Sequence, residues 1–260
     1  MAIAKTQTPA RASSTDHEFA LKLREVTKQF AADAPIVLDG IDLQVQPGEF
    51  VSLLGASGCG KSTLLALIAG LDQATTGTIE TTSKPALMFQ EPALMPWLTA
   101  GRNVELALQL RGVGKAERKQ RASELLELVH LERAIDQRPH ELSGGMRQRV
   151  ALARALAQDS SILLMDEPFA ALDAVTRDIL HEELIRVWQQ TGVTIIFVTH
   201  NVREAVRLGQ RVLLMSSRPG RIIKEWAIDA PEPRRIEDEN VSKLAGTITA
   251  ELRAEIRRHG

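Results

Sequence analysis

A glycine-rich segment, Gly55-Ala56-Ser57-Gly58-Cys59-Gly60-Lys61-Ser62, directly follows the apolar run Phe50–Leu54. It fits the pattern G-x-x-x-x-G-K-[ST], whose backbone N–H groups surround phosphate oxygens when the segment joins a strand to a helix. The apolar residues that follow predict this helix over Ser62–Ala69. A plain Gly/Ser turn is the alternative, but the pattern stands in the required context. We therefore expect a phosphate-binding loop in an α/β protein.

Two side chains of this loop have the chemistry that a nucleotide site needs. Lys61 would reach the β- and γ-phosphate oxygens, and the Ser62 hydroxyl would bind Mg²⁺. ATP and Mg²⁺ are therefore the expected ligands. The loop residues expected to contact ATP are Gly55, Ala56, Ser57, Gly58, Cys59, Gly60, Lys61, Ser62 and Thr63.

The bulk composition argues against several classes of protein. The 260 residues carry a formal net charge of −1, which disfavours a broad basic surface for nucleic acid. Cys59 is the only cysteine, so no intrachain disulfide can form, and a single thiol is compatible with the reducing cytoplasm. No apolar run approaches the ~18 residues that span a bilayer. Residues 1–17 lack the apolar core of a signal peptide and predict a disordered N-terminal lead.

Two further apolar runs end in polar residues. Ile162–Met165 ends at Asp166-Glu167, and Thr194–Val198 ends at Thr199-His200. Continuously apolar runs predict parallel strands buried on both faces, and open α/β sheets bind ligands at the carboxyl ends of such strands. Asp166 would hold Mg²⁺ from the strand next to the loop strand, and Glu167 would polarise an attacking water.

Both of these polar positions have simpler interpretations. An Asp-Glu pair before Pro168 can serve the dipole of a following helix, although a phosphate loop upstream disfavours this. Taken by itself, His200 is either an ordinary surface residue or a donor to the γ-phosphate.

The segment Leu142-Ser143-Gly144-Gly145-Met146 lies between the phosphate loop and the Asp-Glu pair. It resembles the signature of the ABC ATPases, usually Leu-Ser-Gly-Gly-Gln, in that family's motif order. Ser143 and the two glycines would open a helix over Arg147–Ala157, which gives a second anion site with free N–H groups. The resemblance implies a head-to-tail dimer in which this segment faces ATP bound to the other subunit.

The resemblance spans roughly residues 20–230 and assigns the remaining site residues. Gln90 resembles the glutamine that contacts Mg²⁺ and water, His200 the switch histidine, and Asp173 part of the loop that crosses the dimer interface. Phe30 stands where the family has an aromatic residue against adenine, or it is a core residue. The implied sites are Glu167, His200 and Gln90 for catalysis; Ser62, Gln90 and Asp166 for metal; and Ser143, Gly144, Gly145, Met146 and Asp173 for ATP of the opposite subunit.

The sequence departs from the family pattern at two positions. Met146 replaces the usual signature glutamine, and Asn201 follows the histidine where Asp is commoner. The Ser143 hydroxyl and the glycine N–H groups remain, so we expect ATP binding across the dimer. Within the family, the stretches Leu94–Thr99, Asp166–Asp173 and Arg218–Ile222 resemble the nitrate, sulfonate and taurine importer ATPases.

The resemblance implies an α/β fold with a mixed sheet, a RecA-like core, an N-terminal antiparallel β subdomain and an α-helical signature subdomain. We assign residues 18–235 to the ATP-binding domain, with the helical subdomain at about 91–160. A strand pair is predicted over Arg211–Met215 and Arg221–Trp226. Residues 236–260 form a C-terminal extension, for which an apolar stripe of Val241, Leu244, Ile248, Leu252 and Ile256 predicts a helix.

The family resemblance also implies partners and a location. The chain would act at the cytoplasmic face of the membrane, with membrane-spanning subunits, a second ATPase subunit in a homodimer, a secreted solute-binding protein and no nucleic acid. Trp97, just after Gln90, is either a socket for the membrane subunit or packed core. The alternative function is a soluble ABC ATPase acting on nucleic acid or ribosomes, and an exporter half would normally carry fused membrane helices.

The only thiol allows a prediction about reactivity. Cys59 lies in the phosphate loop, near Lys61 and the expected helix N-terminus. Both features lower a thiol pKa, so we expect a nucleophilic cysteine whose alkylation inactivates the enzyme. The alternative is a small residue that packs behind the loop.

Overall fold

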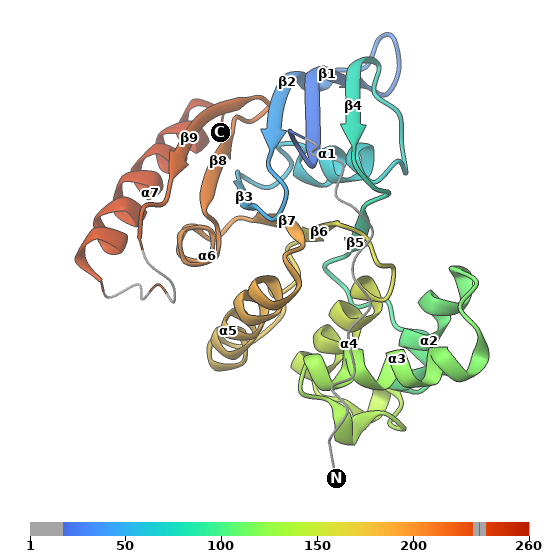
Figure 1. Cartoon of the computed structure of the whole chain (residues 1–260). Helices are drawn as coiled ribbons and strands as arrows, with labels where there is room; N and C mark the ends of the chain where they lie inside the picture. The colour runs from blue at the N-terminus through green and yellow to red at the C-terminus, as the bar shows by residue number, and fades with distance from the viewer. Residues whose placement is uncertain (1–17, 231–233, 235–237, 260) are drawn as a thin grey trace.

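The first sheet lies at the N-terminal end of the described chain. The computed structural model describes residues 18–230, 234 and 238–259, so the expected lead at 1–17 lies outside the described residues. This sheet is antiparallel in the order β2-β1-β4 (Figure 1). Its strands are β1 (Leu21–Gln29), β2 (Ile36–Val45) and β4 (Thr76–Thr81).

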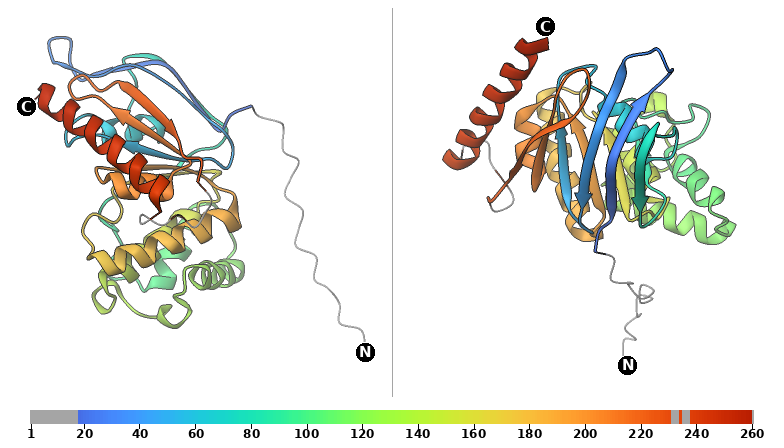
Figure 2. Two further views of the ribbon diagram at one scale, coloured as in Figure 1. Left: turned by 90° about the vertical axis from the view of Figure 1, so that its left-hand side faces the viewer. Right: turned by 90° about the horizontal axis from the view of Figure 1, so that it is seen from above.

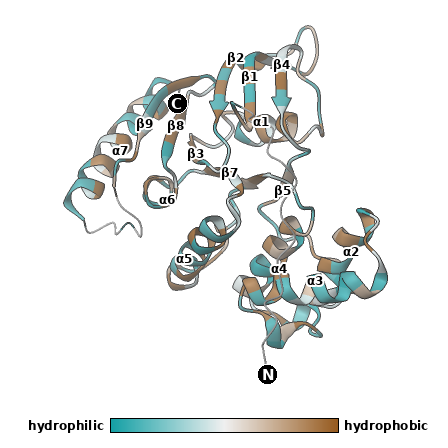
Figure 3. Ribbon diagram, viewed as in Figure 1, coloured by the Kyte–Doolittle hydropathy of each residue, from teal (hydrophilic) through white to brown (hydrophobic). Residues whose placement is uncertain are grey.

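The second sheet is mixed and contains the predicted apolar strands. Its order is β5-β6-β7-β3-β8-β9, and only β9 runs antiparallel to its neighbour. Figure 3 shows hydrophobic residues along its central strands, as expected for strands covered on both faces. The strands are β3 (Phe50–Leu54), β5 (Ala86–Met88), β6 (Ile162–Asp166), β7 (Thr194–Thr199), β8 (Arg211–Met215) and β9 (Ile222–Ala227).

The strand order corrects one expectation. Asp166 was expected on the strand next to the phosphate-loop strand, but β7 lies between β6 and β3. His200 therefore follows the strand that separates the loop from the carboxylates. Since all three strands are parallel, their carboxyl ends still meet at one edge of the sheet.

Helices cover the sheets in three groups. Helix α1 (Lys61–Ile68) shares a core with β1, β2 and the central strands. Helices α2 (Ala100–Leu110), α3 (Lys115–Leu128) and α4 (Gly144–Leu156) gather apart from α1, with the short turns η1 (Glu132–Ala134) and η2 (Pro139–Glu141). Helices α5 (Ala174–Thr191) and α6 (Val202–Leu208) follow the two polar strand ends.

The C-terminal helix α7 (Glu239–His259) runs along the side of the molecule opposite α2–α4 (Figure 2). Val241 and Ile248 of the predicted stripe are buried against α6 and β8, with Leu244 and Leu252 partly buried. Ile256 is exposed, so the buried stripe ends one turn earlier than predicted. The mixed α/β fold with a separate antiparallel sheet and a helical group is the predicted fold, and it is confirmed.

Candidate active site

The phosphate loop joins β3 to α1 in the predicted way, and α1 begins at Lys61. Gly60 has a φ of 102°, and a β-carbon there would lie 2.7 Å from Leu38 Cδ2, so only glycine fits this turn. Lys61 is buried, and its Nζ donates hydrogen bonds to the carbonyl oxygens of Gly55 (2.8 Å) and Ala56 (3.0 Å). The loop thus curves around the lysine ammonium, while Ser57, Gly58 and Ser62 are exposed on its surface.

Cys59 lies in a buried position that disfavours the predicted reactivity. Its side chain is 1% exposed within the core that α1 shares with the sheets. Burial raises the pKa of the Cys59 thiol, and this outweighs the opposing charge of Lys61, whose Nζ lies 3.9 Å from the sulfur. The expectation of a lowered pKa was therefore wrong. The structure instead supports the alternative, in which Cys59 is a small residue that packs behind the loop.

We therefore predict that Cys59 resists alkylation in the folded protein. A buried, protonated thiol is a poor nucleophile, so a maleimide should label native protein slowly and label denatured protein fully. Intact-mass spectrometry gives the labelled fraction without ambiguity, because the chain has no other cysteine. The Cys59→Ala variant is the blank, and complete labelling of native protein within minutes would contradict this prediction.

Asp166 and Glu167 lie where β6 ends. The Asp166 carboxyl lies near the Ser62 side chain at the start of α1, which counteracts part of the rise in its pKa, so the two predicted metal ligands are adjacent. Burial raises the pKa of Asp166, and the charge of Glu167 adds to this effect. Glu167 has a φ of 45°, and its N–H donates to Val198 O on β7 at 3.0 Å. This turn aims the Glu167 side chain back toward the phosphate loop.

The Glu167 carboxylate lies between two cationic or potentially cationic groups. Its Oε1 lies 3.8 Å from Lys61 Nζ, and its Oε2 lies 2.8 Å from His200 Nδ1. The His200 side chain is 56% exposed, whereas that of Glu167 is 20% exposed. The structure thus brings together three predicted residues from three segments, and it places a proton-accepting carboxylate next to the phosphate-loop lysine and the histidine.

The oxygen ligands of this site suit an Mg²⁺ ion that is held jointly by the protein and the bound nucleotide. The described residues contain no group of three or more His, Cys, Asp or Glu side chains that could hold a metal by themselves. A hydroxyl and one carboxylate are adjacent, and Mg²⁺ sites commonly combine one or two such groups with phosphate oxygens and waters. The arrangement therefore fits an ion that binds with the nucleotide.

The predicted signature segment opens α4, three residues earlier than the predicted helix start. Ser143 is the exposed N-cap, and its Oγ accepts from Met146 N at 3.2 Å. Gly145 is required by packing, because a β-carbon there would lie 2.7 Å from Thr176 Cγ2. Met146 packs against the helical core, so its side chain is directed away from the exposed cap. The helix group places this segment apart from α1 (Figure 1).

Gln90 follows β5, and its segment is anchored by α4. Gln148 Nε2 donates to Gln90 O at 3.0 Å, and Arg154 donates to Ala93 O and Pro92 O at 2.7 Å each. The Gln90 side chain is exposed. Gln148 and Arg154 are functional candidates that sequence reasoning missed, since no motif links them to the segment that they hold.

Asp173 caps the helix α5. Its Oδ1 accepts from Thr176 N at 2.9 Å, and this hydrogen bond lowers the pKa of Asp173. Asn201, for which the sequence suggested no role, caps α6 through bonds from Arg203 N and Glu204 N. Its amide oxygen thus does what an aspartate would do at that position.

Two aromatic side chains are exposed rather than packed in the core. Phe30 is 63% exposed with Lys28 Nζ 4.9 Å from its ring centre, and Trp97 is 69% exposed. The core alternative is therefore excluded for both. Exposed aromatic rings of this size suit stacking or docking.

Comparison with known proteins identifies the family. The family described as "ABC transporter" matches residues 38–170. The chain belongs to the ABC transporter family. Accordingly, it is an ATP-binding and ATP-hydrolysing subunit of the ABC type, which confirms the predicted family and activity.

Relatives within the ABC family include importer subunits. An aliphatic sulfonates import ATP-binding protein of Pseudomonas fluorescens is 47% identical over 83% of this chain and 80% of its own. A nitrate import ATP-binding protein of Synechocystis is 48% identical over 75% of this chain and 77% of its own. An ATP-binding cassette solved as a dimer after hydrolysis, bound to ADP and Pi, has a TM-score of 0.71 and 35% identity, and it aligns with 81% of this chain and 100% of that one. Within the described residues, no helix is both long and apolar enough to cross a membrane.

Proposed function

We propose that this chain is the ATPase motor of an importer for a small anion such as an aliphatic sulfonate, nitrate or taurine. The observation that carries the mechanism is the contact of Glu167 with both Lys61 and His200 at the end of the parallel strands. Import and the solute class rest on the relatives, which are named for import of sulfonates and of nitrate.

Each site residue then has a role in phosphoryl transfer. Lys61 and the loop N–H groups bind the β- and γ-phosphates, and Phe30 stacks on adenine. Ser62, Asp166 and Gln90 would hold Mg²⁺, which would neutralise charge on the phosphates. Glu167 accepts the proton of the attacking water, and His200 orients Glu167 and donates to the γ-phosphate.

Two copies would complete each site. Ser143 is exposed and Gly144 and Gly145 open α4, so the Ser143 hydroxyl and the glycine N–H groups can bind the γ-phosphate of the second subunit, next to Met146, whose N–H is bonded to Ser143 Oγ. Asp173 would lie at the same interface. The dimeric cassette supports this arrangement, since it was solved as a dimer.

Membrane subunits would bind near Trp97, at the cytoplasmic face of the membrane. Trp97 follows the segment that Gln148 and Arg154 hold, so force on Trp97 would pass to Gln90 and to α4. A secreted solute-binding protein would deliver the anion to those subunits. The relatives give no support to the nucleic-acid or ribosome alternative.

Reconstitution tests the proposal. The chain would be purified with a partner membrane subunit, placed in liposomes and supplied with the binding protein of that system. We expect ATP hydrolysis to rise when one of the small anions is loaded on the binding protein, with uptake of labelled solute. Hydrolysis that responds to none of the sulfonates, nitrate or taurine would exclude the solute class and leave the ATPase assignment intact.

Lys61→Ala should weaken nucleotide binding itself. The charge-assisted contact to the β- and γ-phosphates is lost, and such bonds are roughly twice as strong as neutral ones. Titration calorimetry with ATP should show an affinity at least about tenfold lower, the equivalent of ~1.4 kcal/mol. Lys84→Ala, which alters an ordinary lysine outside the loop, is the control, and an unchanged affinity of the Lys61 variant would contradict the assignment.

A further inference from the structure

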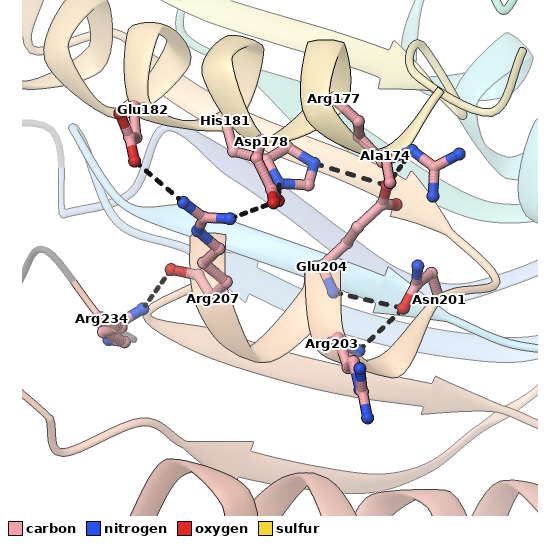
Figure 4. Close-up of a pocket in the computed structure, with 10 residues that line it drawn as sticks. All are labelled: Ala174, Arg177, Asp178, His181, Glu182, Asn201, Arg203, Glu204, Arg207 and Arg234. Carbon is pink, nitrogen blue, oxygen red and sulfur yellow. Dashed lines mark hydrogen bonds and ion pairs between the residues drawn. The ribbon is translucent and has the colours of Figure 1, made fainter. Parts of the chain in front are cut away.

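A buried carboxylate, that of Glu204, lies on the helix that follows His200. Glu204 on α6 is 6% exposed, and its Oε2 accepts a 2.6 Å hydrogen bond from Thr199 Oγ1. Its Oε1 lies 3.4 Å from His181 Nε2 and 3.5 Å from Arg177 Nε, both on α5 (Figure 4). One side chain thus contacts the end of β7 and two residues of the neighbouring helix.

The contacts of Glu204 lead to two segments of the active site. Thr199 directly precedes His200, and its Oγ1 also accepts from Asn201 N at 3.0 Å, so this hydroxyl fixes the backbone on both sides of His200. Arg177 Nη2 donates to Leu172 O at 2.7 Å, next to Asp173. Glu204 therefore bridges the histidine that contacts Glu167 to the segment that precedes α5.

The network continues toward the catalytic strand. His181 is 3% exposed, and its ring packs against Phe169 at 5.5 Å between ring centres. Phe169 lies two residues after Glu167. On the outer side, Arg207 Nη1 pairs with Asp178 at 2.6 Å and Arg207 Nη2 pairs with Glu182 at 3.2 Å, so α5 and α6 are also joined at the surface.

Glu204 is kept charged at a buried position. Burial alone would raise the pKa of Glu204, but the contacts with His181 and Thr199 and the charge of Arg177 outweigh it, and the pKa lies below its ordinary value. A buried carboxylate is costly unless it is paired, so Glu204 favours the arrangement in which Thr199, His181 and Arg177 stay close to it. A group of this kind fixes position rather than adding much stability.

We propose that Glu204 is a positioning residue for ATP hydrolysis, which joins His200 to the segment Ala171–Asp173 through Thr199 and Arg177. This inference rests on the proposed roles of His200 and Asp173. Closure of two copies would move the segment Ala171–Asp173, and the Glu204 network would transmit that movement to His200 and hence to Glu167. Hydrolysis would then follow dimer closure without a change in how one subunit binds ATP.

Four variants of the purified full chain test the proposal: Glu204→Ala, Glu204→Gln, Arg177→Ala and the double variant Glu204→Ala/Arg177→Ala. We expect Glu204→Ala to lower kcat roughly 10- to 100-fold, the scale of a displaced catalytic group, with KM and ATP affinity within about twofold. Glu204→Gln keeps an acceptor for Thr199 but not the charge, so it should recover part of kcat. The double variant should be no slower than the slower single variant, because both changes break one connection.

Glu49→Gln is the matched control. Glu49 is also a largely buried carboxylate paired with an arginine, Arg211 at 2.8 Å, but it lies at the amino end of β3, at the opposite edge of the sheet. Its variant should keep wild-type kcat. If Glu204→Ala does not fold, the glutamine and Arg177 variants decide the question.

The outcomes separate the inference from the proposed function. Wild-type protein without MgATP hydrolysis would refute the proposed function. An active wild type that loses activity in His200→Ala, but keeps full kcat in folded Glu204 and Arg177 variants, would overturn the inference alone. Parallel losses of kcat, ATP affinity and thermal stability in those variants, or additive losses in the double variant, would also overturn it, because they indicate a purely structural role.

Discussion

Glu167→Gln should reduce ATP hydrolysis at least ~100-fold while ATP still binds, since a general base contributes on this scale. The amide keeps the shape of the side chain and can still contact His200 and Lys61, so the site should stay assembled. What is lost is the group that accepts the proton of water. Hydrolysis is measured as phosphate release under saturating MgATP, and binding is measured by calorimetry.

A second readout separates chemistry from binding in this variant. If ATP closes two copies around the nucleotide and hydrolysis reopens them, Glu167→Gln with MgATP should form a stable dimer by size-exclusion chromatography. The Glu49→Gln variant, which alters a carboxylate far from the site, should hydrolyse ATP at the wild-type rate. A Glu167→Gln variant that hydrolyses ATP at near wild-type rate would show that another group acts as the base.

The sequence was most informative where local chemistry decides the structure. Continuous apolar runs predicted β3, β6 and β7, and the residues just past them, such as Asp166 and His200, could be expected at one sheet edge because parallel strands share their direction. The glycines of the phosphate loop predicted its conformation, since Gly60 occupies a backbone region that side chains avoid. The apolar runs and the loop motif therefore indicated an α/β protein with a phosphate site, whereas the mixed sheet and its two subdomains were implied by the family resemblance.

Tertiary neighbours decided what the sequence could not. The pKa of Cys59 depends on burial in the core that it shares with β1 and β2, which lie far from it in sequence, as well as with the adjacent α1. The position of β7 between β3 and β6 depends on the crossover connections. Glu204 reads as one polar residue in a short helix, and its contact with Arg177, 27 residues earlier, arises only when α5 and α6 pack together.

Ser143→Arg should abolish the closed dimer and its hydrolysis while one subunit still binds ATP. Ser143 is exposed at the start of α4, and its hydroxyl is hydrogen-bonded to Met146 N of its own helix. A bulky cation there would block the approach of a second subunit's γ-phosphate. The change also removes an N-cap, which costs about 1 kcal/mol. Thr99→Arg is the matched control, because Thr99 caps α2 in the same helical group through a bond from Arg102 N at 3.2 Å.

A mixture of two inactive variants gives the sharpest form of this test. In a head-to-tail dimer, each site uses Lys61 of one copy and Ser143 of the other. A mixed dimer of Lys61→Ala with Ser143→Arg therefore has one site with both residues intact, whereas either homodimer has none. Mixing should restore hydrolysis that neither variant shows alone. The ATPase activity should be highest when the two variants are mixed in about equal amounts. If both residues served the same subunit's ATP, every site in the mixture would carry a defect, and activity would stay at the level of the separate variants.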